Sequence, residues 1–210
     1  MTIFFLVRHG ETAVMGRKLV GWTPGVHLNP KGQEQAQAVG GVLARYPIRA
    51  IYSSPLERAL ETAAPLSQAL HLPVHQRRAL GEVDYGDFTG RTFRQLARLK
   101  SWQLIRSQPS RASFPGGETL LGVQVRTLRE LWAISEEYPR AMVALFSHGD
   151  PIRLALGVVL GMPVDLYPRL RIAPASISAA RFSSQGTQVL ALGVPPGALL
   201  PSSTRARRAA

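Results

Sequence analysis

Cysteine is absent from the sequence, and acidic residues are few. The absence of thiols excludes disulfides, thiolate catalysis and cysteine-ligated zinc. There are 13 acidic residues against 25 lysines and arginines, and the formal net charge is +12. An excess of this sign suits nucleic acid, an anionic membrane surface or small anionic substrates, although a solvated surface accounts for part of it.

Long hydrophobic runs are also missing. The apolar run at residues 3–7 is too short for a secretory signal and has no basic segment before it. No stretch is long enough to cross a bilayer. We therefore expect a cytoplasmic protein without a membrane partner. Because no basic stripe is interleaved with aromatic residues, we also expect no nucleic-acid partner.

The 210 residues, 45% of them apolar, are enough for one domain with a sizeable core. Short apolar runs indicate buried strands, and amphipathic segments indicate helices between them. Strands are predicted at residues 2–7, 50–53, 73–75 and 141–146, followed by a hairpin of 176–182 with 187–192. Helices are predicted at 30–46, 55–70, 92–107, 118–138 and 150–161.

Two helix starts carry local signals. Asn29 before Pro30 is typical of an N-cap followed by proline in the first turn. The segment 54–57, Ser-Pro-Leu-Glu, predicts a capping box with proline at the first helical position.

Strands that alternate with helices predict an α/β fold, here a three-layer α/β/α sandwich with a mostly parallel central sheet. Residues 85–117 interrupt the alternation, so we expect them to form a small helical cap inserted in a single domain of residues 1–194. The segment 195–210 is rich in proline, serine and arginine and is predicted to be a flexible tail.

Reactive side chains follow three of the predicted strands. Arg8 and His9 come after the first, Arg58 lies just beyond the second, and His148 follows the strand at 141–146. Because ligands of open α/β sheets bind beyond the carboxyl ends of the strands, these side chains are expected to meet. Arginine donors and helix N-termini suit phosphoryl oxygens, so the sequence predicts a phosphate site there.

The motifs around these residues resemble those of the histidine phosphatase superfamily, in its phosphoglycerate mutase-like branch. The resemblance covers nearly the whole chain and rests on five segments in order: 8–12 (RHGET), 53–63 (SSPLERALETA), Glu82 with 85–90 (YGDFTG), 115–119 (PGGET) and 147–150 (SHGD).

The resemblance implies a role for each matching residue. His9 would attack phosphorus and become phosphohistidine, while Arg8, Arg58 and His148 would bind the phosphoryl oxygens. Glu82 would protonate the leaving oxygen and later deprotonate the water. Asp84 and Asp87 share its loop and compete for that role. Further contacts to the substrate are expected from Gly149, Thr23 and Tyr85, and neither a metal nor a cofactor is implied.

The sequence departs from the family pattern in three places. Met15 stands where many members have asparagine, Phe88-Thr89 stands where many have Trp-Glu, and residues 25–28 read Gly-Val-His-Leu where Asp-x-Pro-Leu is common. One polar phosphate ligand is therefore missing or is supplied from elsewhere. Trp22 and Tyr85 fit either a pocket wall or the packing of a loop.

We therefore expect a phosphomonoesterase that acts on a small phosphorylated metabolite and releases inorganic phosphate. One alternative is a phosphoglycerate mutase primed by a bisphosphate. Another is a non-catalytic module that senses phosphate or mediates an interaction. The sequence does not identify the substrate, and it leaves a homodimer open.

Overall fold

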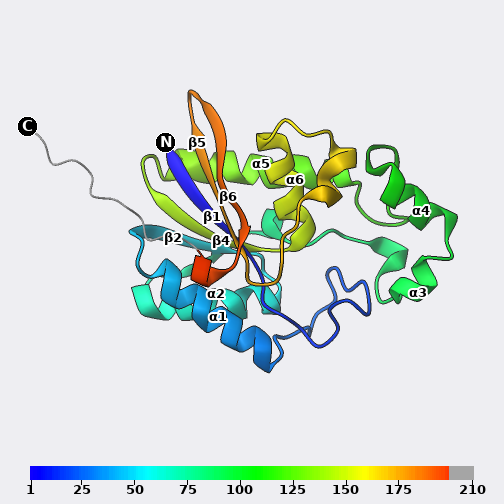
Figure 1. Cartoon of the computed structure of the whole chain (residues 1–210), viewed down its shortest axis with the longest axis horizontal. Helices are drawn as coiled ribbons and strands as arrows, with labels where there is room; N and C mark the ends of the chain where they lie inside the picture. The colour runs from blue at the N-terminus through cyan, green and yellow to red at the C-terminus, as the bar shows by residue number, and fades with distance from the viewer. Residues whose placement is uncertain (199–210) are drawn as a thin grey trace, which may run out of the picture.

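The computed structural model describes residues 1–198, and within them the strands form one six-stranded sheet (Figure 1). Its order is β3-β2-β4-β1-β5-β6. The strands are β1 (Thr2–Arg8), β2 (Ile48–Ser53), β3 (Val74–Gln76), β4 (Met142–Ser147), β5 (Ile177–Ser183) and β6 (Gly186–Val194). Strands β1 to β4 run parallel to one another. β5 pairs antiparallel with β1, and β6 pairs antiparallel with β5.

Helices cover both faces of the sheet, as Figure 1 shows. On one face α1 (Pro30–Leu43) and α2 (Glu57–Leu70) pack against alternate residues of the central strands, such as Phe5 and Ala144. On the other face α5 (Leu120–Glu137) and α6 (Gly149–Val159) pack against Phe4 and Leu145. Strands buried on both faces are continuously apolar, which is why the runs were recognisable. The predicted three-layer sandwich is confirmed.

The start of α2 differs from the prediction. Leu56 is the N-cap, has no side-chain capping bond, and precedes the first helical residue, Glu57. The predicted capping box is therefore wrong. The Ser54 hydroxyl accepts a hydrogen bond from the Leu56 amide and contacts the His148 ring, so it serves the sheet edge and not the helix end. By contrast, the predicted Asn29 cap is confirmed, because its side chain accepts from the Gly32 amide.

The cap contains two short helices where one was predicted, α3 (Phe93–Leu96) and α4 (Lys100–Ser107). Both Leu96 and Ile105 are buried in the same apolar cluster. Nine residues of a straight helix turn through about two and a half turns, which would place these two side chains on opposite faces. The break between the helices allows both to reach the cluster.

That cluster also joins the cap to the rest of the protein. Phe114 packs there with Leu120 and Val123 of α5 and with Leu154 of α6. The predicted tail begins with a short 3-10 turn, Pro196–Ala198, near α1, and residues 199–210 of the tail lie outside the described residues. We propose that residues 1–194, cap included, unfold as one domain, because they share this buried surface.

This proposal predicts the effect of Phe114→Ala. Removing a buried aromatic ring should lower the free energy of unfolding by about 3 kcal/mol, through lost burial and a cavity. Urea unfolding followed by circular dichroism and by tryptophan fluorescence should still give coincident transitions. Two separate transitions in the wild-type protein would contradict the single-domain proposal.

Candidate functional site

The carboxyl ends of three parallel strands bring the predicted phosphate ligands together. β4 lies between β1 and β2, with Arg8 paired in register with Ser147 and Ser53 paired with Phe146. As a result the rings of His9 and His148 are 5.1 Å apart between centroids.

His9 is buried, and its ring is oriented by its neighbour. Nδ1 lies 2.7 Å from the Gly10 carbonyl oxygen, which can only accept, so Nδ1 carries the proton and Nε2 has a free lone pair. Burial, followed by the charges of Arg58 and Arg8, holds the pKa of His9 well below its usual range. At neutral pH His9 is therefore a neutral imidazole, as a nucleophile requires.

Four buried nitrogen atoms around His9 have no hydrogen-bond partner within residues 1–198: Arg8 Nε, Arg58 Nε and Nη1, and His148 Nδ1. Each guanidinium is nevertheless held by a hydrogen bond to a backbone carbonyl. Arg8 Nη1 donates to the Ile172 carbonyl at 2.7 Å, and Arg58 Nη2 donates to that of Gly21 at 2.8 Å. Because an unpaired buried donor is costly, converging donors of this kind indicate a binding site for an anion.

Ser54 accounts for the orientation of His148. Its hydroxyl oxygen lies 2.8 Å from His148 Nε2 and accepts a bond from the Leu56 amide at 3.3 Å. Since the Ser54 oxygen already accepts from Leu56, we assign its proton to Nε2, and in that tautomer the other ring nitrogen carries a proton. That nitrogen, Nδ1, is the buried one without a partner. An N–H group at Nδ1 would lie in the ring next to that of His9, 5.1 Å away between centroids.

Glu82 is half-buried in the loop before the cap. Burial, and next the charge of Asp150, raise the pKa of Glu82 to about 7. Its Oε1 accepts a hydrogen bond from the Val83 amide at 3.0 Å. Asp84 and Asp87, which competed with it, are exposed, and neither lines the cavities at the site. The geometry therefore favours Glu82 as the acid.

Two cavities meet at Glu82. One of about 120 Å³ is lined by His9, Arg58 and other residues that include Arg8 and Thr12. The other, of about 320 Å³, lies between the cap and α6. Arg8, Leu19, Glu82, Tyr85 and Phe93 line both. A carboxyl group at this junction is well placed to act on an atom that bridges a phosphoryl group and its alcohol.

Of the three remaining predicted substrate contacts, two line a cavity at the site and one does not. Tyr85 lines both cavities, and its hydroxyl donates to Asp150 at 3.2 Å. Gly149 lines the larger cavity close to the Arg8 guanidinium. Thr23 lines neither cavity, and its amide donates to the Val20 carbonyl in a turn, so its role stays a prediction.

Met15 lines the smaller cavity with its thioether 4.0 Å from Arg8 Nη2. Sulfur is a weak acceptor and does not replace an amide donor. Thr12, which was not singled out from the sequence, is buried in the same wall and has a hydroxyl group. Its place within the first motif was the only signal that could have identified it.

Arg126 of α5 was also missed, although it holds the loop that carries Glu82. It donates to the carbonyl oxygens of Ala79, Gly81 and Glu82 at 2.7, 3.0 and 2.9 Å, and it pairs with Glu118 at 2.7 Å. Trp22 supports the same loop, because its indole N–H donates to the Glu82 carbonyl.

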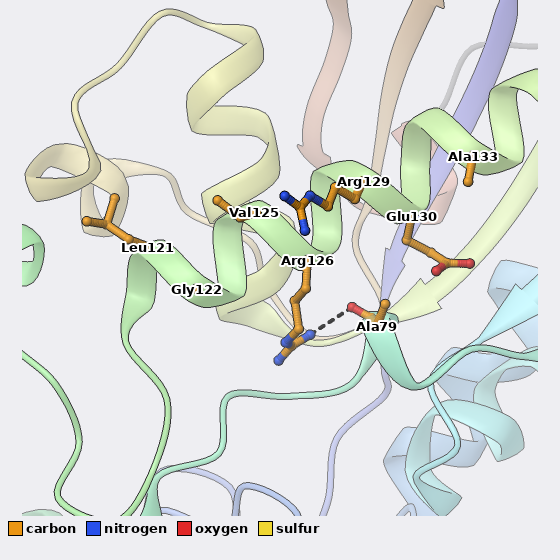
Figure 2. Close-up of a pocket in the computed structure, with 8 residues that line it drawn as sticks. All are labelled: Ala79, Leu121, Gly122, Val125, Arg126, Arg129, Glu130 and Ala133. Carbon is orange, nitrogen blue, oxygen red and sulfur yellow. Dashed lines mark hydrogen bonds between the residues drawn. The ribbon is translucent and has the colours of Figure 1, made fainter.

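Arg126 also lines a hollow of about 650 Å³ between α5 and Ala79. Figure 2 shows the residues that line it. That hollow includes Arg129 and Val125 but none of the predicted site residues. The site at the sheet edge is therefore distinct from the larger surface hollow. Within residues 1–198, no three histidine, aspartate or glutamate side chains are arranged to hold a metal ion. No helix of that part of the chain is long and apolar enough to cross a membrane.

Comparison with known proteins agrees with this geometry. A bifunctional protein of Mycobacterium tuberculosis is 34% identical over 194 residues, which are 91% of this chain and 53% of that protein. The chain thus spans about half the length of the first curated relatives that it matches. The uncharacterized phosphatase PhoE of Bacillus subtilis is 31% identical over 186 residues, covering 88% of this chain and 91% of the relative.

Other relatives are named as a phosphoserine phosphatase and as probable phosphoglycerate mutases. Among solved structures, YhfR of Bacillus stearothermophilus superposes with a TM-score of 0.87 at 25% identity, covering 92% of this chain and 98% of that one. The sequence profile of the histidine phosphatase superfamily (branch 1) matches residues 4–195. The chain therefore belongs to the histidine phosphatase superfamily, a family of phosphatases and phosphoglycerate mutase-like proteins.

Proposed function

We propose that the protein is a phosphomonoesterase that hydrolyses a small phosphorylated metabolite through a phosphohistidine at His9. The observation that carries the proposal is that Arg8 and Arg58, each with an unpartnered buried nitrogen, line a small cavity with His9, whose ring lies 5.1 Å from that of His148 between centroids. The oxygens of a phosphoryl group would accept hydrogen bonds from these donors, and its negative charge would be balanced by the two guanidinium groups. Fixed positive partners of this kind supply most of the catalysis of phosphoryl transfer.

In the first step, His9 Nε2 forms a bond to phosphorus as the bond from phosphorus to the alcohol oxygen breaks. Glu82 gives its proton to that oxygen, because an alkoxide is a poor leaving group. In the second step water attacks phosphorus, the bond to His9 breaks, and Glu82 takes a proton from the water. Inorganic phosphate leaves, and both residues return to their starting states.

The pKa of His9 is lowered and that of Glu82 is raised, and each shift fits the proposed role of its residue. The lowered pKa of His9 keeps its lone pair available, whereas the raised pKa of Glu82 leaves a proton to donate near neutrality. A group with a pKa of about 7 can act as an acid in one step and as a base in the next.

A phosphoglycerate mutase is the second candidate, since some relatives are named as probable mutases. A mutase keeps the dephosphorylated product close to the phosphohistidine and excludes water. The cavity of about 320 Å³ beside Glu82 leaves space for water around a three-carbon acid, which favours hydrolysis. We therefore prefer the phosphatase.

The mechanism predicts that His9→Ala abolishes turnover and phosphate labelling. Brief incubation of the wild-type protein with a ³²P-labelled alkyl phosphate, followed by alkaline quenching, should trap an acid-labile label on a histidine. The His9→Ala protein should carry none. Turnover by His9→Ala would sink the mechanism. A folded wild-type protein that neither turns over nor becomes labelled would indicate a non-catalytic module.

The raised pKa of Glu82 predicts the pH dependence of the first step. Above about pH 7 Glu82 loses its proton, so kcat/KM for an alkyl phosphate should fall, while His9 stays neutral down to well below pH 6.5. Glu82→Gln should reduce kcat/KM about 100-fold or more and remove this alkaline limb. With 4-nitrophenyl phosphate, whose phenolate leaves without a proton, the loss should be much smaller. Equal losses with both substrates would contradict the role of Glu82.

Arg126 is proposed to position Glu82, and this can be tested separately. Arg126→Met removes the bonds to three loop carbonyls and to Glu118, so kcat/KM for alkyl phosphates should fall about 10-fold or more, with a smaller loss for 4-nitrophenyl phosphate. Arg129→Met, an exposed neighbour on α5, is the matched control and should behave as wild type. Losses that do not depend on the leaving group would indicate only a structural role.

A further inference from the structure

The cavity of about 320 Å³ beside Glu82 is where the alcohol part of the substrate would lie, given the proposed function. It is separated from the nucleophile by the shared residues Arg8, Glu82 and Tyr85. Its volume lies at the lower end of the range of ~300–1,000 Å³ found for pockets that hold drug-sized ligands. A three-carbon alcohol or acid would therefore leave much of it unfilled.

Five of the residues that line this cavity are aromatic and five are charged. Among the aromatic ones, Phe93, Trp102 and Phe114 come from the cap, and Tyr167 comes from the 3-10 helix Val164–Arg169. Contacts between rings fix their positions: the Phe114 ring lies 4.9 Å from that of Tyr85 between centroids, and the Phe93 ring lies 6.2 Å from that of Trp102. Flat, apolar surfaces of this kind bind rings more readily than polyols.

Phe93 is 39% exposed, which is a large fraction for an aromatic ring. Trp102 beside it is half-buried. Both line the cavity, so part of their apolar surface is available at the position proposed for the substrate body. Burial of this surface by an apolar ligand would be favourable.

The charged side chains of the cavity differ in how they are paired. Asp150 is bonded to Arg153 at 2.8 Å, and Arg153 also donates to the Leu170 carbonyl, so these two charges largely neutralise each other. Arg106 of α4 is exposed, and no ion pair or side-chain hydrogen bond joins it to another residue of the part of the chain that the structure describes. Arg8 also lines the cavity but is assigned to the phosphoryl group, so Arg106 is the cation left for the rest of the substrate.

We infer that the substrate is the phosphate ester of an alcohol with an aromatic or similarly flat apolar body and a negatively charged group, such as a carboxylate, that pairs with Arg106. The phosphoryl group would lie in the smaller cavity, the ester oxygen beside Glu82, and the body between the cap and α6. The inference rests on the proposed phosphatase function and specifies its substrate class.

The test compares four alkyl phosphates whose leaving oxygens are similarly poor: glycerol 3-phosphate, benzyl phosphate, 4-carboxybenzyl phosphate and 3-phosphoglycerate. Phosphate release gives kcat/KM for each, and isomerisation of 3-phosphoglycerate is followed with and without a bisphosphate primer. Benzyl phosphate should exceed glycerol 3-phosphate about 10-fold or more through burial of its ring. The carboxylate should add about 2-fold to 5-fold, as an exposed ion pair does.

Variants separate the two features. Arg106→Gln should bring the ratio of 4-carboxybenzyl to benzyl phosphate close to one, while Arg98→Gln, an exposed cap arginine that lines neither cavity, should leave the ratio unchanged. Trp102→Ala should reduce the preference for benzyl phosphate over glycerol 3-phosphate. Because Arg106 is exposed, its variant should fold even if Trp102→Ala does not.

Each outcome decides one of the two proposals. If glycerol 3-phosphate is turned over as well as benzyl phosphate, the inferred substrate class is wrong while the phosphatase stands. If Arg106→Gln and Arg98→Gln change the carboxylate ratio equally, Arg106 is not its partner. If no ester releases phosphate, or if 3-phosphoglycerate is isomerised faster than it is hydrolysed, the proposed function itself fails.

Discussion

Parallel pairing of β1, β4 and β2 is the constraint on which the site depends. The register places Arg8 beside Ser147 and Ser53 beside Phe146, so the residue that follows each strand emerges at one edge of the sheet. The apolar faces of α1, α2, α5 and α6 bury these strands on both sides and leave little freedom for the edge to move. Positioning, on which phosphoryl transfer depends, is thus a consequence of core packing.

Burial and nearby charges at this edge of the sheet explain the shifted pKa values of His9, His148 and Glu82. Burial and the two guanidinium groups together favour the neutral form of His9, and the same neighbours act on His148. Glu82 lies near the same arginines, yet its burial and the charge of Asp150 outweigh their attraction and raise its pKa. Because burial disfavours the charged form of either group, it lowers the pKa of His9 and raises that of Glu82, so both can be uncharged in one pocket.

In the proposed mechanism, the cap determines what surrounds the leaving alcohol. It shares the cluster of Phe114, Leu96 and Ile105 with α5 and α6, so its aromatic side chains form a fixed wall above the sheet edge. In the proposed mechanism, residues at the strand ends bind the phosphoryl group, whereas the cap surrounds the alcohol. Relatives of the chain are named for different phosphorylated substrates.

The sequence by itself determined the strands, most helices and the Asn29 cap, because apolar periodicity and capping are local signals. It also predicted that Arg8, His9, Arg58 and His148 meet, because the carboxyl ends of parallel strands lie at one edge of an α/β sheet. Tertiary structure decided the rest. It assigned Ser54 to His148 instead of a helix cap, and it divided the predicted helix at 92–107 so that two buried side chains could share one cluster. It also brought Arg126 to a loop 44 residues before it, a contact between distant segments that no local pattern records.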